Sequence, residues 1–164
     1  MSARQHLRAH APAVEIDVQS PLWDAEPAAE ETVRNAIAAA AAQAPAVGEV
    51  SVLLTDDDAI RVLNRTWRGI DKPTNVLSFP APAAKGPQPL LGDIVIAYET
   101  LLRESAAEQT PFLHHLAHLS VHGFLHLLGY DHQDDSQAEA MEGLEREILA
   151  RLDIADPYHE TGNA

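Results

Sequence analysis

Cysteine is absent from this chain of 164 residues, and the chain has no long apolar run. Without cysteine the protein forms no disulfide, and a structural zinc ion would need nitrogen and oxygen ligands. The alanine-rich stretch AIAAAAAQAPAV is too short and too weakly apolar to span a bilayer. The first residues, MSARQHLRAHAPAVEIDVQS, lack the apolar core of a signal peptide. These absences predict a cytoplasmic protein with no membrane partner.

Positive charge is also scarce. The chain has 11 basic and 25 acidic residues and a net charge of −14, so nucleic acid should repel it unless its basic residues gather where contact occurs. Four of them do gather in one short stretch: Arg61, Arg65, Arg68 and Lys72. The first three share one face of a predicted helix. Such a face either contacts nucleic acid or is simply solvated, and the pattern leaves both interpretations open.

Four segments have the composition and alternation of β-strands. They are Val14–Val18, Glu49–Thr55, Asn75–Phe79 and Gly92–Ala97. Helical patterns start near Pro27, at Asp57–Arg68, around Glu99–Ala107, and twice more towards the C-terminus. This order predicts a single α+β domain over residues 1–164, in which helices pack on a small mixed sheet of about four strands. The proline-rich segment Pro80–Pro89 is predicted to be a loop.

Local signals mark where three of the helices begin and end. The segment Asp56–Gly69 starts with three aspartates that can cap a helix over 57–68, and its final glycine ends that helix. The segment Thr110–Gly129 starts with a threonine N-cap and a first-turn proline, and its helix should run to Leu128. The segment Ser136–Leu152 starts with a capping box, Ser-Gln-Ala-Glu.

The helix predicted to start at Thr110 is apolar nearly all round, which is typical of a buried helix. Four of its histidines nevertheless fall within an arc of roughly 80°. These are His115, His118, His122 and His126. A buried polar stripe needs partners. For any one of these histidines, the simplest interpretation is a core side chain that is hydrogen-bonded to a carboxylate or a carbonyl group.

The spacing of the last histidines favours a metal site. His122 and His126 stand one helical turn apart, so both rings can face one ion. Gly129 can take a left-handed conformation that returns His132 towards the same ion. Three neutral imidazoles leave a fourth position for water, which is the pattern of a catalytic zinc site. The sequence predicts one Zn²⁺ per chain, although other late divalent metals share these ligand preferences.

The neighbours of these ligands have two interpretations. His118, one turn before His122, and Asp131, next to His132, can orient a ligand ring or hold a water molecule. The alternative for His118 is simple core packing. We assign no role to His114, and none to the adjacent His115.

The same histidine spacing occurs in the metzincin proteases, which makes proteolysis a rival interpretation. Those enzymes place a glutamate immediately after the first histidine, where it acts as general base. Here that position is Gly123. Peptide hydrolysis would lack its proton acceptor, so the sequence disfavours a protease.

Three longer motifs carry a family resemblance. WRGIDKPTNVLSFP (67–80), LGDIVI (91–96) and HLSVHGFLHLLGYDH (118–132) closely resemble the YbeY family of bacterial zinc-dependent endoribonucleases. The resemblance extends from about Val50 to Tyr158, while the first fifty residues carry none of these motifs. The loop sequence APAAKGPQP, between two of the motifs, departs from the family pattern.

The resemblance implies zinc ligands at His122, His126 and His132, in agreement with the spacing, and a functionally important arginine at Arg68. It implies an endoribonuclease specific for single-stranded RNA, acting in 3′-end maturation of small-subunit ribosomal RNA and in ribosome quality control in the cytoplasm. DNA is not an expected substrate. Aromatic residues are few, so recognition of RNA bases by stacking has little support.

A mechanism can be assembled from these residues. Zinc with an open position can lower the pKa of a bound water towards about 7, and Arg68 can hold a phosphate through its planar guanidinium. Otherwise Arg68 is a solvated charge at a helix C-terminus. Asp93 has a structural or a catalytic interpretation, and no residue is an obvious general base. Two alternatives stay open: a non-catalytic zinc-containing ribosome-assembly factor, and a metallohydrolase of another substrate.

Overall fold

The computed structural model describes residues 11–82 and 89–158. Its strands form a single sheet in the order β1-β2-β4-β3. The strands are β1 (Ala13–Val18), β2 (Glu49–Thr55), β3 (Val76–Pro80) and β4 (Leu90–Ala97). β1, β2 and β4 are parallel, whereas β3 runs antiparallel to β4. The predicted small mixed sheet and the α+β class are confirmed.

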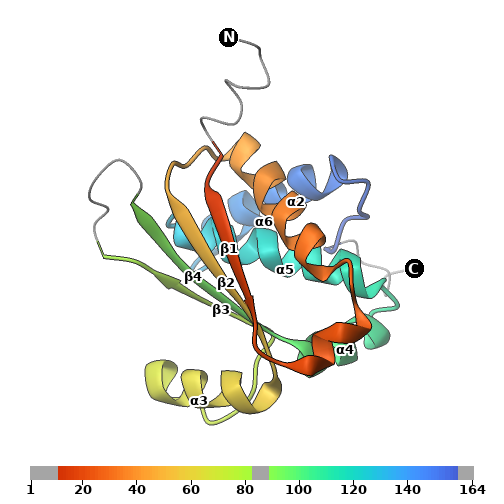
Figure 1. Ribbon diagram of the computed structural model, residues 1–164. Helices are drawn as coiled ribbons and strands as arrows, with labels where there is room; N and C mark the ends of the chain where they lie inside the picture. The colour runs from red at the N-terminus through yellow and green to blue at the C-terminus, as the bar shows by residue number, and fades with distance from the viewer. Residues whose placement is uncertain (1–10, 83–88, 159–164) are drawn as a thin grey trace.

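Helices lie on both faces of this sheet (Figure 1). They are the short 3₁₀ helix η1 (Pro21–Ala25) and the α-helices α2 (Ala29–Gln43), α3 (Asp57–Arg68), α4 (Tyr98–Ala107), α5 (Phe112–Leu127) and α6 (Asp135–Ala150). α2, α5 and α6 cover one face, and the main core lies between them and the strands. α3 packs against the opposite face, near one end of the strands, over a smaller apolar cluster.

β4 has a nearly continuous apolar sequence because helices cover both faces of the sheet at this strand. Ile94 and Ile96 belong to the main core, whereas Val95 and Ala97 belong to the cluster beneath α3. A strand that is buried on both faces loses the alternation of apolar and polar residues. For this reason GDIVIA was recognisable as a buried strand from its sequence.

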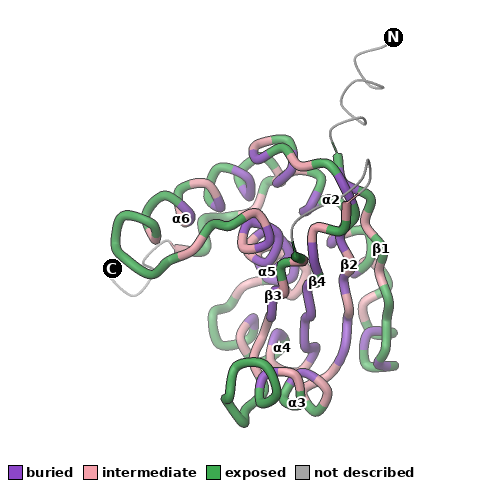
Figure 2. The backbone as a smooth tube through the Cα atoms, turned by 90° about the vertical axis from the view of Figure 1, so that its left-hand side faces the viewer, coloured by how far each residue is buried: buried purple, intermediate pink, exposed green. Residues whose placement is uncertain are grey.

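Helix α5 lies at the centre of the molecule, and Figure 2 shows it buried along most of its length. It contacts α2, α4 and α6 and lies across β3 and β4. Side chains such as Leu116, Val121 and Phe124 are fully buried. The helix therefore carries its histidines through the core, as its sequence predicts.

The start of α5 was predicted wrongly. Its N-cap is Pro111, and Thr110 makes no capping hydrogen bond. Instead the Thr110 amide donates to the Ser105 carbonyl at 2.9 Å, and Gln109 has a φ of 54°, so both residues close the end of α4. At its other end, the helix stops one residue before the predicted boundary.

The capping box predicted for the last helix is also wrong. Asp134 is the N-cap of α6, and its carboxylate accepts from the Gln137 amide at 2.8 Å. Ser136 lies inside the helix. An aspartate caps as well as a serine does, and its charge also interacts favourably with the helix dipole. By contrast, α3 has the predicted bounds, with Asp56 as its cap and Gly69 in the left-handed conformation at its end.

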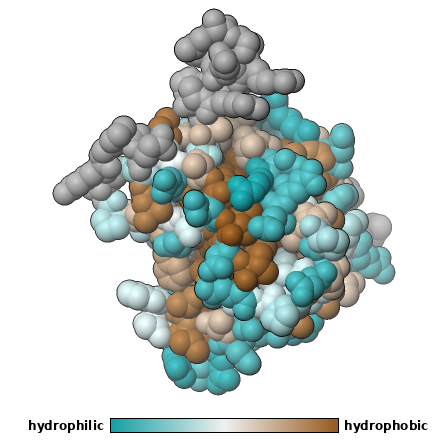
Figure 3. All heavy atoms as spheres, viewed as in Figure 1, coloured by the Kyte–Doolittle hydropathy of each residue, from teal (hydrophilic) through white to brown (hydrophobic). Residues whose placement is uncertain are grey.

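The remaining surface agrees with the composition. On the face shown in Figure 3, hydrophilic residues lie between the apolar ones. Among the described residues, no helix has both the length and the apolarity needed to cross a membrane. Residues 83–88 of the loop predicted at Pro80–Pro89 lie outside the described residues.

Candidate metal centre

Three imidazoles converge at the C-terminal end of α5. One ring nitrogen from each of His122, His126 and His132 lies within 4.8 Å of the other two. The Nε2 atoms of His122 and His126 are 3.0 Å apart. Two nitrogens that each bind zinc at about 2.0 to 2.1 Å in a tetrahedral site lie about 3.3 Å apart. The donor set and its spacing therefore fit a zinc ion.

The electrostatics of this cluster also suit a metal. Burial and the neighbouring imidazoles of His122 and His132 lower the pKa of His126. A lowered pKa keeps the ring neutral and its lone pair available. His132 is exposed and the other two rings are half-buried, so one side of the cluster faces solvent.

The turn after α5 brings His132 to the other two histidines. Gly129 has a φ of 100°, and the Tyr130 amide donates to the Leu125 carbonyl at 3.1 Å, so the chain reverses direction. The Asp131 carboxylate accepts from the backbone amide of His132 at 2.7 Å. Asp131 therefore orients the backbone of the third histidine.

The cluster lies in a cleft of about 450 Å³ between the end of α5, β3 and the end of α3. Arg68 lines the same cleft. Its guanidinium donates to the Ser78 carbonyl at 3.1 Å and lies over the Phe79 ring at 5.9 Å. Both contacts hold the charged group beside the histidines. The structure thus brings together all four residues predicted for the site.

The basic residues of the segment 61–72 are less available for contact with nucleic acid than their sequence suggests. Asp71 binds the Arg61 guanidinium through two hydrogen bonds, at 2.9 and 3.2 Å. Of the four basic residues, Arg68 is the one that lines the cleft. Asn75 and Ser78 also line it, and their side chains donate to Glu104 and to the Gly123 carbonyl, respectively.

Gly123 has a packing reason to lack a side chain. A Cβ atom there would lie 2.9 Å from Ile94 Cγ2 and 3.2 Å from Ser78 Oγ. The position faces the sheet, where α5 approaches β3 and β4, and not the cleft. A glutamate at this position would therefore meet the core, and the metzincin arrangement does not fit this helix.

Sequence reasoning missed one residue of the site, Glu145 on α6. Its Oε1 atom lies 2.6 Å from His122 Nδ1, and its Oε2 atom lies 3.2 Å from His118 Nε2 and accepts from the Tyr158 hydroxyl. Glu145 is fully buried. Burial raises its pKa, but the hydrogen bonds from His118, His122 and Tyr158 outweigh burial and lower it to about 2. The group is therefore a buried carboxylate anion.

A signal for Glu145 was present in the sequence. It shares the buried face of α6 with Met141, Ile148 and Leu149. A charged residue among the apolar positions of an amphipathic helix is rarely buried unless it is paired. That signal shows that a partner exists, but it does not identify the partner.

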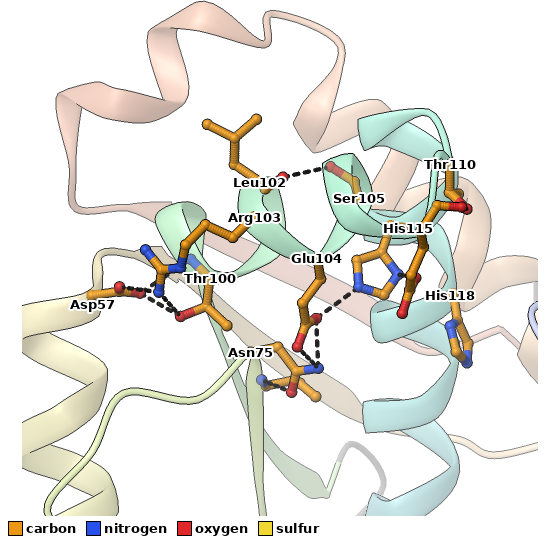
Figure 4. A network of polar contacts seen from close by, with 12 residues as sticks. Asp57, Asn75, Thr100, Leu102, Arg103, Glu104, Ser105, Thr110, His115 and His118 are labelled. Carbon is orange, nitrogen blue, oxygen red and sulfur yellow. Dashed lines mark hydrogen bonds and ion pairs between the residues drawn. The ribbon is translucent and has the colours of Figure 1, made fainter.

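His115, to which no role was assigned, has a different partner. Its Nε2 atom lies 2.8 Å from Glu104 Oε1, and Glu104 also accepts from the Asn75 side chain at 2.9 Å (Figure 4). These contacts join α4, α5 and the residue that precedes β3. In the described part of the chain, two groups of His and acidic residues could hold a metal ion, and His114 belongs to neither. They are His122, His126 and His132, and the overlapping set His118, His122 and Glu145.

The chain matches known proteins over nearly its whole length. The family model described as endoribonuclease YbeY matches residues 16–153. An endoribonuclease YbeY from Bradyrhizobium sp. is 56% identical over 156 residues, which cover 90% of this chain and 92% of the relative. One from Nitrobacter winogradskyi is 53% identical over 161 residues, which cover 93% and 85%, respectively.

A solved structure gives independent support for the fold. The solution structure of TM1509 from Thermotoga maritima matches with a TM-score of 0.51 and 25% identity, over 90% of this chain and 99% of that one. The family and the enzyme class predicted from the three motifs are confirmed. The chain belongs to the endoribonuclease YbeY family.

Proposed function

We propose that this protein is a zinc-dependent endoribonuclease that cuts single-stranded RNA, with zinc held by His122, His126 and His132. The observation that carries the proposal is the convergence of three imidazole nitrogens in a cleft that Arg68 also lines. Imidazole is a preferred zinc ligand, and three such ligands leave one position open. The metal site and the phosphate-binding group thus share one solvent-facing cleft.

Each group has a chemical task. When bound, zinc supplies Lewis acidity towards a phosphate oxygen or a water molecule. Arg68 binds the phosphate and stabilises the negative charge that develops on it, and its contacts with Ser78 and Phe79 hold it in place beforehand. A preorganised donor of this kind contributes about 100-fold to 1,000-fold in rate.

The proposed biological substrate is ribosomal RNA. We expect the protein to act in 3′-end maturation of small-subunit RNA and in ribosome quality control, and therefore in the cytoplasm. The membership of the YbeY family supports this assignment.

The described strands share one sheet, which supports a single domain over residues 1–164.

The test compares the wild type with His126→Ala, Arg68→Ala and, as control, His114→Ala, a histidine on the same helix outside the cluster. Bound metal is measured on each protein, and each is incubated with single-stranded RNA, single-stranded DNA and a peptide. His126→Ala should lose zinc and RNA cleavage. Arg68→Ala should keep zinc and lose about 100-fold or more in cleavage rate.

Other results would redirect the proposal. RNA binding without cleavage above a contaminant control would indicate the non-catalytic assembly factor. Cleavage of DNA or peptide in preference to RNA would indicate another metallohydrolase. Full RNA cleavage by His126→Ala without bound metal would refute the zinc-dependent mechanism.

A further inference from the structure

We propose that Glu145 is a positioning residue that fixes the ring of His122 for metal binding, and that His118 and Tyr158 hold Glu145 in place. The inference rests on the proposed zinc site. It adds a buried group, on a different helix, that need not touch metal or RNA.

The two ring nitrogens of His122 face different groups. Its Nε2 atom faces His126, and its Nδ1 atom lies 2.6 Å from Glu145 Oε1. A carboxylate anion only accepts hydrogen bonds. The proton of the neutral ring therefore resides on Nδ1, and the lone pair of Nε2 points into the histidine cluster. This is the tautomer that a ligand of the proposed site needs.

The second carboxylate oxygen of Glu145 is also held in place. Its Oε2 atom accepts from the Tyr158 hydroxyl and lies 3.2 Å from His118 Nε2. Both oxygens are thus engaged, and the side chain has no exposed surface. The group links α6 and the segment after it to the middle of α5. His118 therefore supports His122 indirectly, through the carboxylate.

Stability alone is a poor reason for this arrangement. A buried carboxylate must be stripped of water, and replacing a buried ion pair with apolar residues is often neutral or stabilising. The position shares the buried face of α6 with Met141, Ile148 and Leu149, which are all apolar. A carboxylate in that setting is better explained by what it does to His122.

The same helix provides a matched control. Glu104 contacts His115 at 2.8 Å, but neither residue belongs to the histidine cluster. Removing either carboxylate deprives one histidine of α5 of its acceptor. Only removal of Glu145 should affect the metal.

The experiment compares the wild type with Glu145→Leu, Glu145→Gln, Tyr158→Phe and Glu104→Leu. The ring tautomer of His122 is read from ¹⁵N chemical shifts in the metal-free proteins at mildly alkaline pH. Zinc affinity is measured by competition with a chromophoric chelator. Circular dichroism checks the fold of each variant.

We expect Glu145→Leu to lose the preference for the Nδ1–H tautomer and to bind zinc about 10-fold to 100-fold more weakly. Glu145→Gln keeps an acceptor oxygen without the charge, so its loss should be intermediate, and it covers the case in which Glu145→Leu does not fold. Tyr158→Phe should lose a few-fold, and Glu104→Leu should bind zinc as the wild type does.

The outcomes separate this inference from the proposed function. If both Glu145 variants kept the wild-type tautomer and zinc affinity, the inference would be overturned while the zinc site stood. An equal loss in Glu104→Leu would overturn it too, because the effect would then be general to the helix. If the wild type bound no zinc, both proposals would fall.

Discussion

Two histidines of helix α5, His115 and His122, each contact a carboxylate of another helix, and the two pairs differ in what the far side of the ring faces. In the first, His115 is buried, with Glu104 at 2.8 Å from Nε2 and Glu108 at 3.9 Å from Nδ1. In the second, His122 has Glu145 at 2.6 Å from Nδ1, and its Nε2 faces two other imidazoles. The first ring has acidic groups on both sides, whereas the second directs one nitrogen into a cleft.

We infer from this difference that the same kind of contact serves two purposes. Glu104 also binds Asn75, so the first pair ties together α4, α5 and the start of β3 (Figure 4). Glu145 binds His118 and Tyr158, so the second pair is itself held from behind. A histidine with acidic groups at both ring nitrogens stabilises the fold. A histidine whose second ring nitrogen faces the cleft can bind a metal ion.

The largest expected effect is on how much zinc raises the free energy of unfolding. This increase should depend on the pair that contains His122 and not on the pair that contains His115. A ligand present at 1,000 times its Kd raises the free energy of unfolding by about 4 kcal/mol. Wild type and His115→Asn should both show that increase, whereas His122→Asn should show none. Urea denaturation with and without zinc measures it. An equal increase in all three proteins would remove the distinction between the pairs.

The next effect concerns the pair that contains His115. Glu104→Leu leaves a buried His115 nitrogen and the Asn75 amide without their acceptor. Each unsatisfied group costs about 1 to 3 kcal/mol when buried, so we expect a loss of about 2 kcal/mol in the free energy of unfolding. Chemical denaturation of the metal-free protein checks this. An unchanged midpoint would show that the pair adds nothing to the fold.

A smaller effect tests how closely α5 lies on the sheet at Gly123, next to His122. Gly123→Ala places a methyl group 2.9 Å from Ile94 Cγ2. Overpacking costs about 1 to 3 kcal/mol, and the better helix propensity of alanine offsets up to about 1 kcal/mol. We expect a net loss of about 1 kcal/mol by thermal denaturation. Gly143→Ala on α6, with open space around it, should instead stabilise the protein.

The smallest effect is spectroscopic. Burial and the hydrogen bond to Glu145 raise the pKa of Tyr158 well above its ordinary range. The bond therefore stabilises the fold at pH values below about 10 and is lost only as the pH rises beyond the raised pKa. Phenolate absorbance of the folded wild type and Tyr158→Phe should coincide through about pH 10. In concentrated urea, the wild type should show one more ionising tyrosine. A difference between the folded proteins would mean that Tyr158 is not held by Glu145.

Local signals made much of the fold predictable. The helix over Asp57–Arg68 carries its own cap and its own terminating glycine, and the strand over Glu49–Thr55 carries its own alternation. Both have the predicted bounds. The caps at Thr110 and Ser136 were predicted wrongly, because the end of α4 and the competing Asp134 decided which residue capped each helix.

The candidate site was likewise predictable only in part. Three of its histidines lie within eleven residues of one helix and turn, so their convergence follows from sequence spacing. Glu145 reaches His122 only because α6 packs beside α5, which no local pattern specifies. Asp71 similarly engages Arg61 across a turn, which weakens the basic face suggested by the sequence.

The most direct test of the account is cleavage of single-stranded RNA by the metal-free wild type before and after one equivalent of zinc is added. We predict no cleavage above a buffer control before addition, and recovery of full activity at one zinc per chain. Arg68→Ala should bind the same equivalent and stay nearly inactive. Cleavage by the metal-free protein at the rate of the zinc-loaded protein would contradict the central claim.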